Sequence, residues 1–150
     1  MIDKFEGEYA FLSNLYLCPV EFEGLKYTNA ESVFQSCKFR NVKSRKVFTN
    51  MAPRSAVLKG KHVTLRDDWE DVKDKYMYRV VKAKFSQNPD LKQKLLDTGE
   101  EELIAGNEKH NNYWGYCTCE KCVNRYHRNK LGEILMKVRE EFKNELEVLD

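Results

Sequence analysis

The fold of this chain is decided by residues 30–39, Ala30-Glu31-Ser32-Val33-Phe34-Gln35-Ser36-Cys37-Lys38-Phe39. Apolar side chains recur there at the i, i+3, i+4 and i+7 spacing of one helix face. They are Ala30, Val33, Phe34 and Cys37. A second line, about a third of the way round the helix, carries Glu31, Gln35 and Lys38. The pattern predicts a short helix with its apolar stripe in the core and a carboxylate, an amide and an amine along one edge.

That polar edge has two interpretations. A solvated flank with a weak ion pair between Glu31 and Lys38 would stabilise the helix by only a few tenths of a kcal/mol. A functional site is the other interpretation, since the three groups can donate, accept and transfer protons. The spacing alone favours the solvated flank, and the argument for a site comes from the resemblance given below.

Composition limits the classes of protein to which this chain can belong. Its 150 residues, 41% of them hydrophobic, suffice for one domain with its own core and are too few for two ordinary domains, so we expect a single domain over residues 1–150. No apolar run approaches the roughly 20 residues of a membrane span, and residues 1–4 lack the layout of a secretory signal. We therefore expect a cytoplasmic protein without membrane association. The net charge of +2 is too balanced to indicate a protein that grips many nucleic-acid phosphates.

The segments around residues 30–39 predict an α+β fold, mostly helical, with a small antiparallel strand component near the N-terminus. Residues 11–27 alternate loosely in hydrophobicity and turn near Glu23-Gly24. Pro53 and Gly60 mark the two ends of a scaffold helix.

Two longer helices are predicted from hydrophobic periodicity. Residues 69–83 carry the strongest periodic signal, with Asp68 as the expected N-cap and with Trp69 and Met77 as core side chains. A second apolar stripe predicts a C-terminal helix through Leu131, Ile134, Leu135, Val138 and Phe142. We expect its last ten or so residues to fray.

Five motifs, taken as a set, resemble the NADAR family of YbiA-like proteins. They lie in residues 11–16, 27–39, 65–77, 110–115 and 129–139. The chain departs from the family pattern at Asn111, where family members usually have Asp. That difference weakens any mechanism that needs an acid or base at this position.

The resemblance implies an N-glycosidase, which cleaves the bond between the anomeric carbon of a sugar and a nitrogen. By the same resemblance Glu31 and Lys38 are the candidate catalytic residues. The candidate substrate-binding residues are Asn14, Gln35, Asn111, Trp114 and Gly115. The amides would hold ribose or base, and Trp114 would stack on the base. No cofactor is expected to be required for catalysis.

Two substrate classes are associated with the family. One is ADP-ribose on the exocyclic amine of guanine, in DNA, RNA or a nucleotide, and the other is a small ribosylamine metabolite, the phosphoribosyl-amino-pyrimidine of riboflavin synthesis. The first class raises the question of an associated ADP-ribosyltransferase toxin system. A nucleic-acid substrate would present a flipped or single-stranded base, with surface residues such as Lys43, Arg45, Lys46, Lys59 and Lys61 along its backbone. A module that binds ADP-ribose without cleaving it is the non-enzymatic alternative.

Two chemical routes would cleave a ribosylamine. An oxocarbenium ion can form at the anomeric carbon while Glu31 activates water. Alternatively the sugar ring opens to an imine, Lys38 displaces the departing amine as a Schiff base, and Glu31 shuttles the proton. The second route, which we favour, requires burial to lower the pKa of Lys38 from roughly 10.4.

Cysteine usage points to a reducing compartment. Five cysteines are an odd number, and three crowd into Cys117, Cys119 and Cys122, which argues against a secreted disulfide scaffold. With His127, these thiolates would complete a tetrahedral structural zinc site, and one branch of the NADAR family has a similar stretch. His110 lies upstream. Because the C-x-C gap is tighter than the usual two-residue gap, ordinary reduced thiols are the alternative.

Overall fold

A computed structural model describes residues 1–149, which divide into two compact units. The first unit is Asn14–Lys92, and the second joins Met1–Ser13 to the chain from Gln93 onward. The fold is α+β and mostly helical, as predicted. Among residues 1–149, no helix combines the length and the apolar character needed to cross a membrane. The single domain expected over residues 1–150 stays a prediction.

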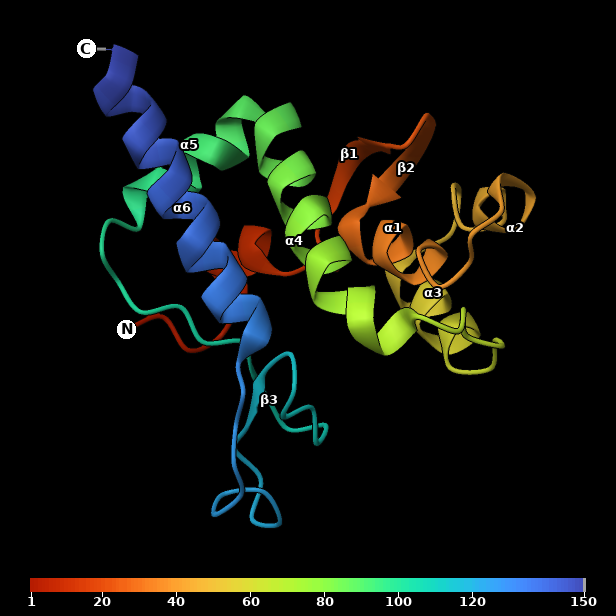
Figure 1. The fold of residues 1–150 in the computed structure, drawn as a ribbon. Coiled ribbons are helices and arrows are strands. Elements are labelled where there is room, and N and C mark those ends of the chain that lie inside the picture. The colour runs from red at the N-terminus through yellow and green to blue at the C-terminus, as the bar shows by residue number, and fades with distance from the viewer. Residues whose placement is uncertain (150) are drawn as a thin grey trace. The chain divides into compact units, whose positions relative to one another are not determined.

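The unit of residues 14–92 begins with a β-hairpin, which confirms the predicted strand component (Figure 1). Strand β1 (Leu17–Phe22) pairs antiparallel with β2 (Leu25–Asn29). Glu23 and Gly24 turn the chain with φ angles of 46° and 86°, the left-handed conformation that a tight hairpin turn requires. One face of β1 is buried, and this gives the hairpin a core side.

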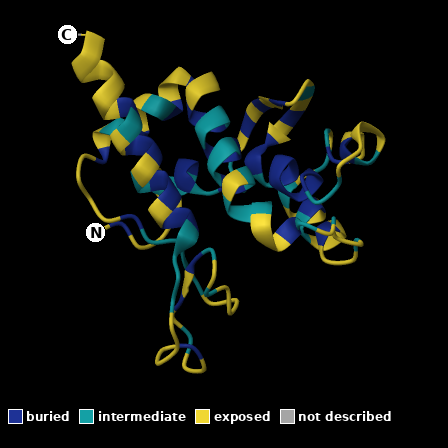
Figure 2. Cartoon of the chain, viewed as in Figure 1, coloured by how far each residue is buried: buried dark blue, intermediate teal, exposed yellow. Residues whose placement is uncertain are grey.

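Helix α1 (Ala30–Ser36) follows β2 directly. The side chain of Asn29 caps its N-terminus by accepting a hydrogen bond from the Ser32 N–H at 2.8 Å. The predicted apolar stripe is buried, and Figure 2 shows the helix as one of the darkest parts of the ribbon. The stripe therefore holds α1 in the core of this unit.

Three further helices complete this unit: α2 (Val42–Lys46), α3 (Pro53–Gly60) and α4 (Trp69–Gln87). Helix α1 packs against both α3 and α4. Trp69 and Met77 are core side chains as expected, with the Trp69 ring 5.3 Å from that of Phe34. Asp68 occupies the N-cap position without a capping bond from its side chain, because its carboxylate pairs with the Arg66 guanidinium at 2.6 Å.

The other unit contains the 3₁₀ helix η1 (Gly7–Leu12), two-residue strands β3 (Gly106–Asn107) and β4 (Tyr116–Cys117), and α6 (Lys130–Leu149). Helix α5 (Pro89–Asp97) crosses the boundary between the units. The strands pair in parallel. Helix α6 buries the predicted apolar stripe and runs unbroken to Leu149, and the fraying of its last ten or so residues stays a prediction.

Candidate active site

The polar edge of α1 is present in the structure as a connected set of side chains. Gln35 Nε2 donates a hydrogen bond to Glu31 Oε1 at 2.8 Å across one helical turn. The chain continues to turn beyond Ser36, because the Lys38 N–H donates to the Gln35 carbonyl at 3.2 Å. This extra turn brings Lys38 to the same edge.

Gly60, the last residue of α3, closes this edge. Lys38 Nζ donates a hydrogen bond to the Gly60 carbonyl at 2.9 Å. A methyl group on Gly60 would lie 1.8 Å from Gln35 Oε1 and 3.3 Å from Lys38 Nζ, so any larger residue would displace the Gln35 side chain. Sequence reasoning identified Gly60 only as a helix end. Its φ is not in the left-handed region, so the constraint at this position comes from the neighbouring Gln35 side chain and not from its own backbone.

Gln35 Oε1 is the one buried side-chain nitrogen or oxygen within residues 1–149 that has no hydrogen-bond partner. Leaving such an acceptor unsatisfied costs roughly 1–3 kcal/mol. The amide is held in place by Glu31 on its other side. An orphan acceptor beside a carboxylate and an amine is the pattern expected of a site that completes its hydrogen bonds with a ligand.

Burial moves both titratable groups of this edge toward their neutral forms. It raises the pKa of the Glu31 carboxyl, against the hydrogen bond from Gln35 and the positive charge of Lys38. It lowers the pKa of the Lys38 amine, against the negative charge of Glu31. A half-buried carboxyl and a half-buried amine on one edge, each shifted toward its neutral form, suit general acid–base or amine-nucleophile chemistry.

Asn14 lies at the start of the same helix. Its backbone carbonyl accepts the Glu31 N–H at 3.0 Å, and its Nδ2 lies 3.2 Å from Met77 Sδ. The side chain is buried. The structure thus places Glu31, Gln35 and Lys38 together on the unit of residues 14–92, and Asn14 joins them through its backbone while its amide contacts Met77.

The other three predicted substrate-binding residues belong to the second unit and form one loop. The Trp114 N–H donates to Asn111 Oδ1 at 3.0 Å, so the side chain of Asn111 shapes this turn. A methyl group on Gly115 would lie 2.3 Å from the carbonyl oxygen of Ala105. The close approach that requires Gly115 is therefore made by the protein's own backbone.

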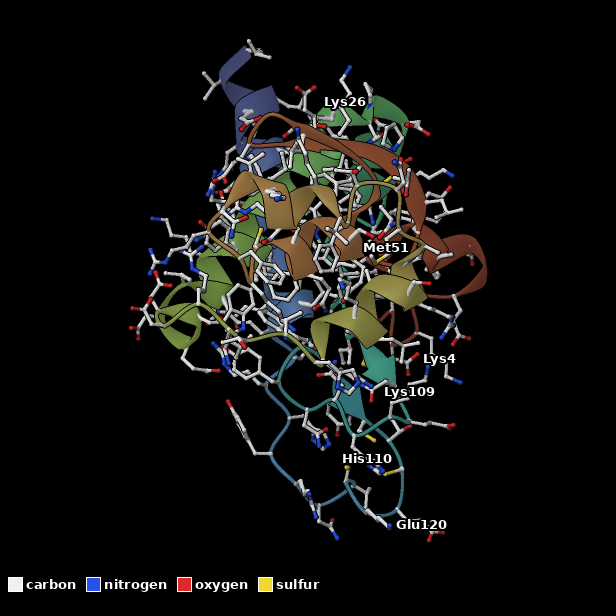
Figure 3. All side chains as sticks on the ribbon, turned by 90° about the vertical axis from the view of Figure 1, so that its right-hand side faces the viewer. Lys4, Lys26, Met51, Lys109, His110 and Glu120 are labelled. Atoms are coloured by element: carbon white, nitrogen blue, oxygen red, sulfur yellow. The ribbon has the colours of Figure 1, made fainter. Side chains whose placement is uncertain are left out.

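The cysteine loop, residues 107–129, brings a different histidine to the thiols from the one that was predicted. Cys117, Cys119 and Cys122 come together, and His110 joins them in place of His127. In Figure 3 the labelled His110 ring lies among the sulfur atoms. His127 Nε2 lies 3.0 Å from the Cys117 carbonyl oxygen, and its ring stacks on Tyr116 with centroids 3.6 Å apart. Backbone and ring contacts thus direct His127 away from the thiols.

Arg45 does not belong to a surface basic face, contrary to expectation. It is buried, and its guanidinium pairs with the carboxylate of Glu23. Its Nε also donates to the Phe39 carbonyl at 2.8 Å. Arg45 therefore ties the hairpin turn to the segment after α1. Lys43, Lys46, Lys59 and Lys61 are exposed as expected.

Comparisons with known proteins identify the family to which this chain is similar in sequence and fold. The sequence model of the NADAR domain matches residues 2–143. The chain is 31% identical over 137 residues to N-glycosidase YbiA of Shigella boydii, covering 89% of this chain and 82% of that protein. A riboflavin biosynthesis protein of Vibrio vulnificus is 33% identical over 139 residues, covering 91% of this chain and 36% of its own length. The NMR structure of Escherichia coli YbiA matches with a TM-score of 0.80 and 30% identity, over 97% of this chain and 88% of that one.

Proposed function

The chain belongs to the NADAR domain family, and from that membership we propose that it is a hydrolase of N-glycosidic bonds with its catalytic groups on the polar edge of α1. The name N-glycosidase carried by the Shigella relative supports the reaction class. The observation that carries the proposal is the orphan acceptor Gln35 Oε1 beside Glu31 and Lys38. A sugar hydroxyl would satisfy that acceptor once the Gln35 side chain turns toward the ligand, since the oxygen is buried against Gly60 in this structure.

In the favoured route, the ribose ring opens and its anomeric carbon becomes an imine of the departing amine. The neutral Lys38 amine adds to this carbon. The departing amine takes a proton from the Glu31 carboxyl and leaves, so Lys38 holds the sugar as a Schiff base. Water then hydrolyses that bond, which releases the sugar aldehyde, restores the neutral lysine amine and returns a proton to Glu31. The lowered pKa of Lys38 and the raised pKa of Glu31 support this assignment of roles.

The alternative route uses an oxocarbenium ion at the anomeric carbon. Glu31 then acts as the base that activates water, which requires its ionised form. The raised pKa of Glu31 makes that form less available. The two routes differ in whether a covalent bond to Lys38 ever forms.

The substrate that we propose is ADP-ribose attached to the exocyclic amine of guanine in a nucleic acid or nucleotide. An exocyclic ribosylamine keeps an N–H on the linking nitrogen, so its sugar ring can open to the imine that Lys38 attacks. A base linked through a ring nitrogen has no such hydrogen. In a nucleic acid the base would have to be flipped out or single-stranded. An ADP-ribosyltransferase toxin, which would make this substrate, is the partner class that we propose.

A second candidate substrate is the phosphoribosyl-amino-pyrimidine of riboflavin synthesis. The riboflavin biosynthesis protein of Vibrio vulnificus, 33% identical to this chain, favours it. This chain spans only 36% of that protein. Like the first substrate, the phosphoribosyl-amino-pyrimidine is an exocyclic ribosylamine. The same residues would therefore serve either substrate.

Both substrates can be tested in one experiment. Purified protein is incubated with a guanine-ADP-ribosylated oligonucleotide and, separately, with the ribosylamino-pyrimidine, and the products are read by mass. Release of free ADP-ribose and intact oligonucleotide by the wild type supports the first substrate. Cleavage of the ribosylamino-pyrimidine but not of the oligonucleotide, seen as release of ribose phosphate, supports the second substrate. Binding of ADP-ribose with no cleavage of either would contradict the proposed hydrolase and favour a binding module.

A further inference from the structure

Four side chains of the cysteine loop converge on one point although they are spread over 13 positions of the chain, from His110 to Cys122. Their ligand atoms all lie within 4.8 Å of one another. His110 Nδ1 is 3.3 Å from the sulfurs of Cys119 and Cys122 and 4.0 Å from that of Cys117. Cys117 and Cys122 are buried, while Cys119 is half-buried and His110 is exposed.

These distances fit a tetrahedral zinc ion. Zinc bonded to thiolates at about 2.3 Å and to an imidazole nitrogen at about 2.0–2.1 Å sets neighbouring ligand atoms roughly 3.5–3.8 Å apart. The separations from His110 to the three sulfurs bracket that range. Three cysteines and one histidine form one of the closed donor sets of structural zinc sites.

The backbone around the cluster supports the same conclusion. His110 adopts a φ of 63°, a left-handed conformation that is uncommon for a residue other than glycine. In that conformation its backbone N–H lies 3.4 Å from Cys117 Sγ while its ring faces the thiols. Asn112 Oδ1 accepts the Cys117 N–H at 3.0 Å, and Cys119 accepts the Cys122 N–H in a tight turn. The backbone thus supports the ligands from several sides, as outer contacts of metal sites do.

We propose that His110, Cys117, Cys119 and Cys122 bind one structural zinc ion, and that His127 is not a ligand. Protein atoms would occupy all four coordination positions of the ion, so no position is open for catalysis. It joins the two ends of residues 110–117, the segment that holds Asn111 and Trp114. Its role is to fix the conformation of a loop whose only regular structure is two-residue strands.

The two histidines provide a matched pair for the test. Wild type, His110→Ala and His127→Ala are purified under reducing conditions from zinc-containing medium, and metal is measured by mass spectrometry. We expect one zinc per chain in the wild type and in His127→Ala. His110→Ala should hold less than one zinc per chain and should lose it to a chelator at least tenfold faster than the wild type. Wild type without zinc, or zinc lost in His127→Ala and kept in His110→Ala, would overturn the proposal.

A second measurement avoids variants that fail to fold. Zinc in the wild-type protein is exchanged for Co²⁺, whose visible absorption reports coordination geometry and thiolate bonding. We expect the bands of tetrahedral cobalt with thiolate charge transfer. Hydrogen exchange in residues 107–129 should speed up on chelation. Octahedral cobalt spectra, or exchange in this loop unchanged by chelation, would contradict a structural ion here. Neither readout depends on glycosidase activity.

Discussion

Two regions of this chain gather polar side chains by different physical means. The edge of α1 is held by apolar packing, because the opposite stripe of the helix is buried and α3 and α4 pack against the helix. The cysteine loop has two-residue strands and is organised by the side chains that converge within it. In the first region the hydrophobic core positions the polar groups, and in the second the proposed metal ligands replace the core.

The comparison explains why the two regions suit different tasks. A helix edge fixed by packing can leave one polar atom unsatisfied, as Gln35 Oε1 is, because the surrounding core compensates for the cost. A loop with little apolar core cannot compensate for an unsatisfied polar atom. In the cysteine loop every proposed ligand faces the others. We therefore assign catalysis to the first region and structural stabilisation to the second.

The largest effect is expected from removing the Lys38 amine. Lys38→Ala should lower kcat by roughly 10³-fold or more, because the proposed covalent intermediate cannot form. Turnover is measured with the substrate that the product assay identifies. Lys26→Ala, an exposed lysine of the same unit, is the matched control and should stay within about twofold of wild type. Equal activity of the two variants would break the assignment of catalysis to α1.

Packing of α1 is tested next through Phe34, whose ring lies against Trp69. Phe34→Ala should destabilise the protein by about 3–5 kcal/mol, since a fully buried aromatic ring is lost. Denaturant unfolding followed by circular dichroism measures the change. Zinc content in the cysteine loop should not change. A decrease in the free energy of unfolding below about 1 kcal/mol would mean that packing does not hold this region together.

Gly60 tests how closely α3 must approach the edge. Gly60→Ala should lower kcat/KM by about 10²-fold, because the new methyl group displaces the Gln35 amide from beside Glu31 and Lys38. Gly99→Ala, at an open turn with no atom within 4 Å of the added carbon, controls for loss of glycine in general. It should affect stability more than rate, since its φ is 64°. A fully active Gly60→Ala enzyme would show that this spacing is not needed.

The smallest effect concerns pH. The proposed route needs the Lys38 amine neutral and the Glu31 carboxyl protonated at the same time, so kcat/KM should follow a bell-shaped pH profile. Burial lowers the pKa of Lys38 and raises that of Glu31, so both limbs should lie inside the roughly 4.3 and 10.4 of the free groups. Glu31→Gln removes the titrating acid and a negative charge that raises the pKa of Lys38, so its kcat/KM should rise to a plateau that begins below roughly 10.4, with no fall at high pH, whatever its absolute rate. A variant whose rate still falls at high pH would contradict these roles.

The sequence predicted those features that depend on local periodicity. The apolar stripe of α1, the hairpin turn at Glu23-Gly24 and the long helix after Asp68 all follow from spacing and turn chemistry. The pairing of Glu31 with Gln35 is also local, since the residues lie one helical turn apart. These features need no knowledge of the rest of the fold.

The features that the sequence did not reveal depend on contacts between distant segments. Gly60 meets Lys38 across 22 positions, and no periodic pattern connects them. Two histidines flank the thiols at similar separations, so spacing could not choose between His110 and His127. The choice follows from the unusual φ of His110 and from the stacking of His127 on Tyr116. In the sequence, Gly60 stands out only as a glycine at a helix end, and His110 only as a histidine that precedes Asn111 and Asn112.

The central claim is that Lys38 on α1 bonds covalently to the sugar during cleavage. Borohydride added during turnover reduces a Schiff base to a stable amine, and peptide mapping by mass then locates the adduct. We predict one sugar adduct on Lys38, absent without substrate, with loss of activity in proportion to labelling. An enzyme that turns over in the presence of borohydride, stays fully active and carries no adduct on Lys38 would contradict the claim and leave Glu31-activated water as the route.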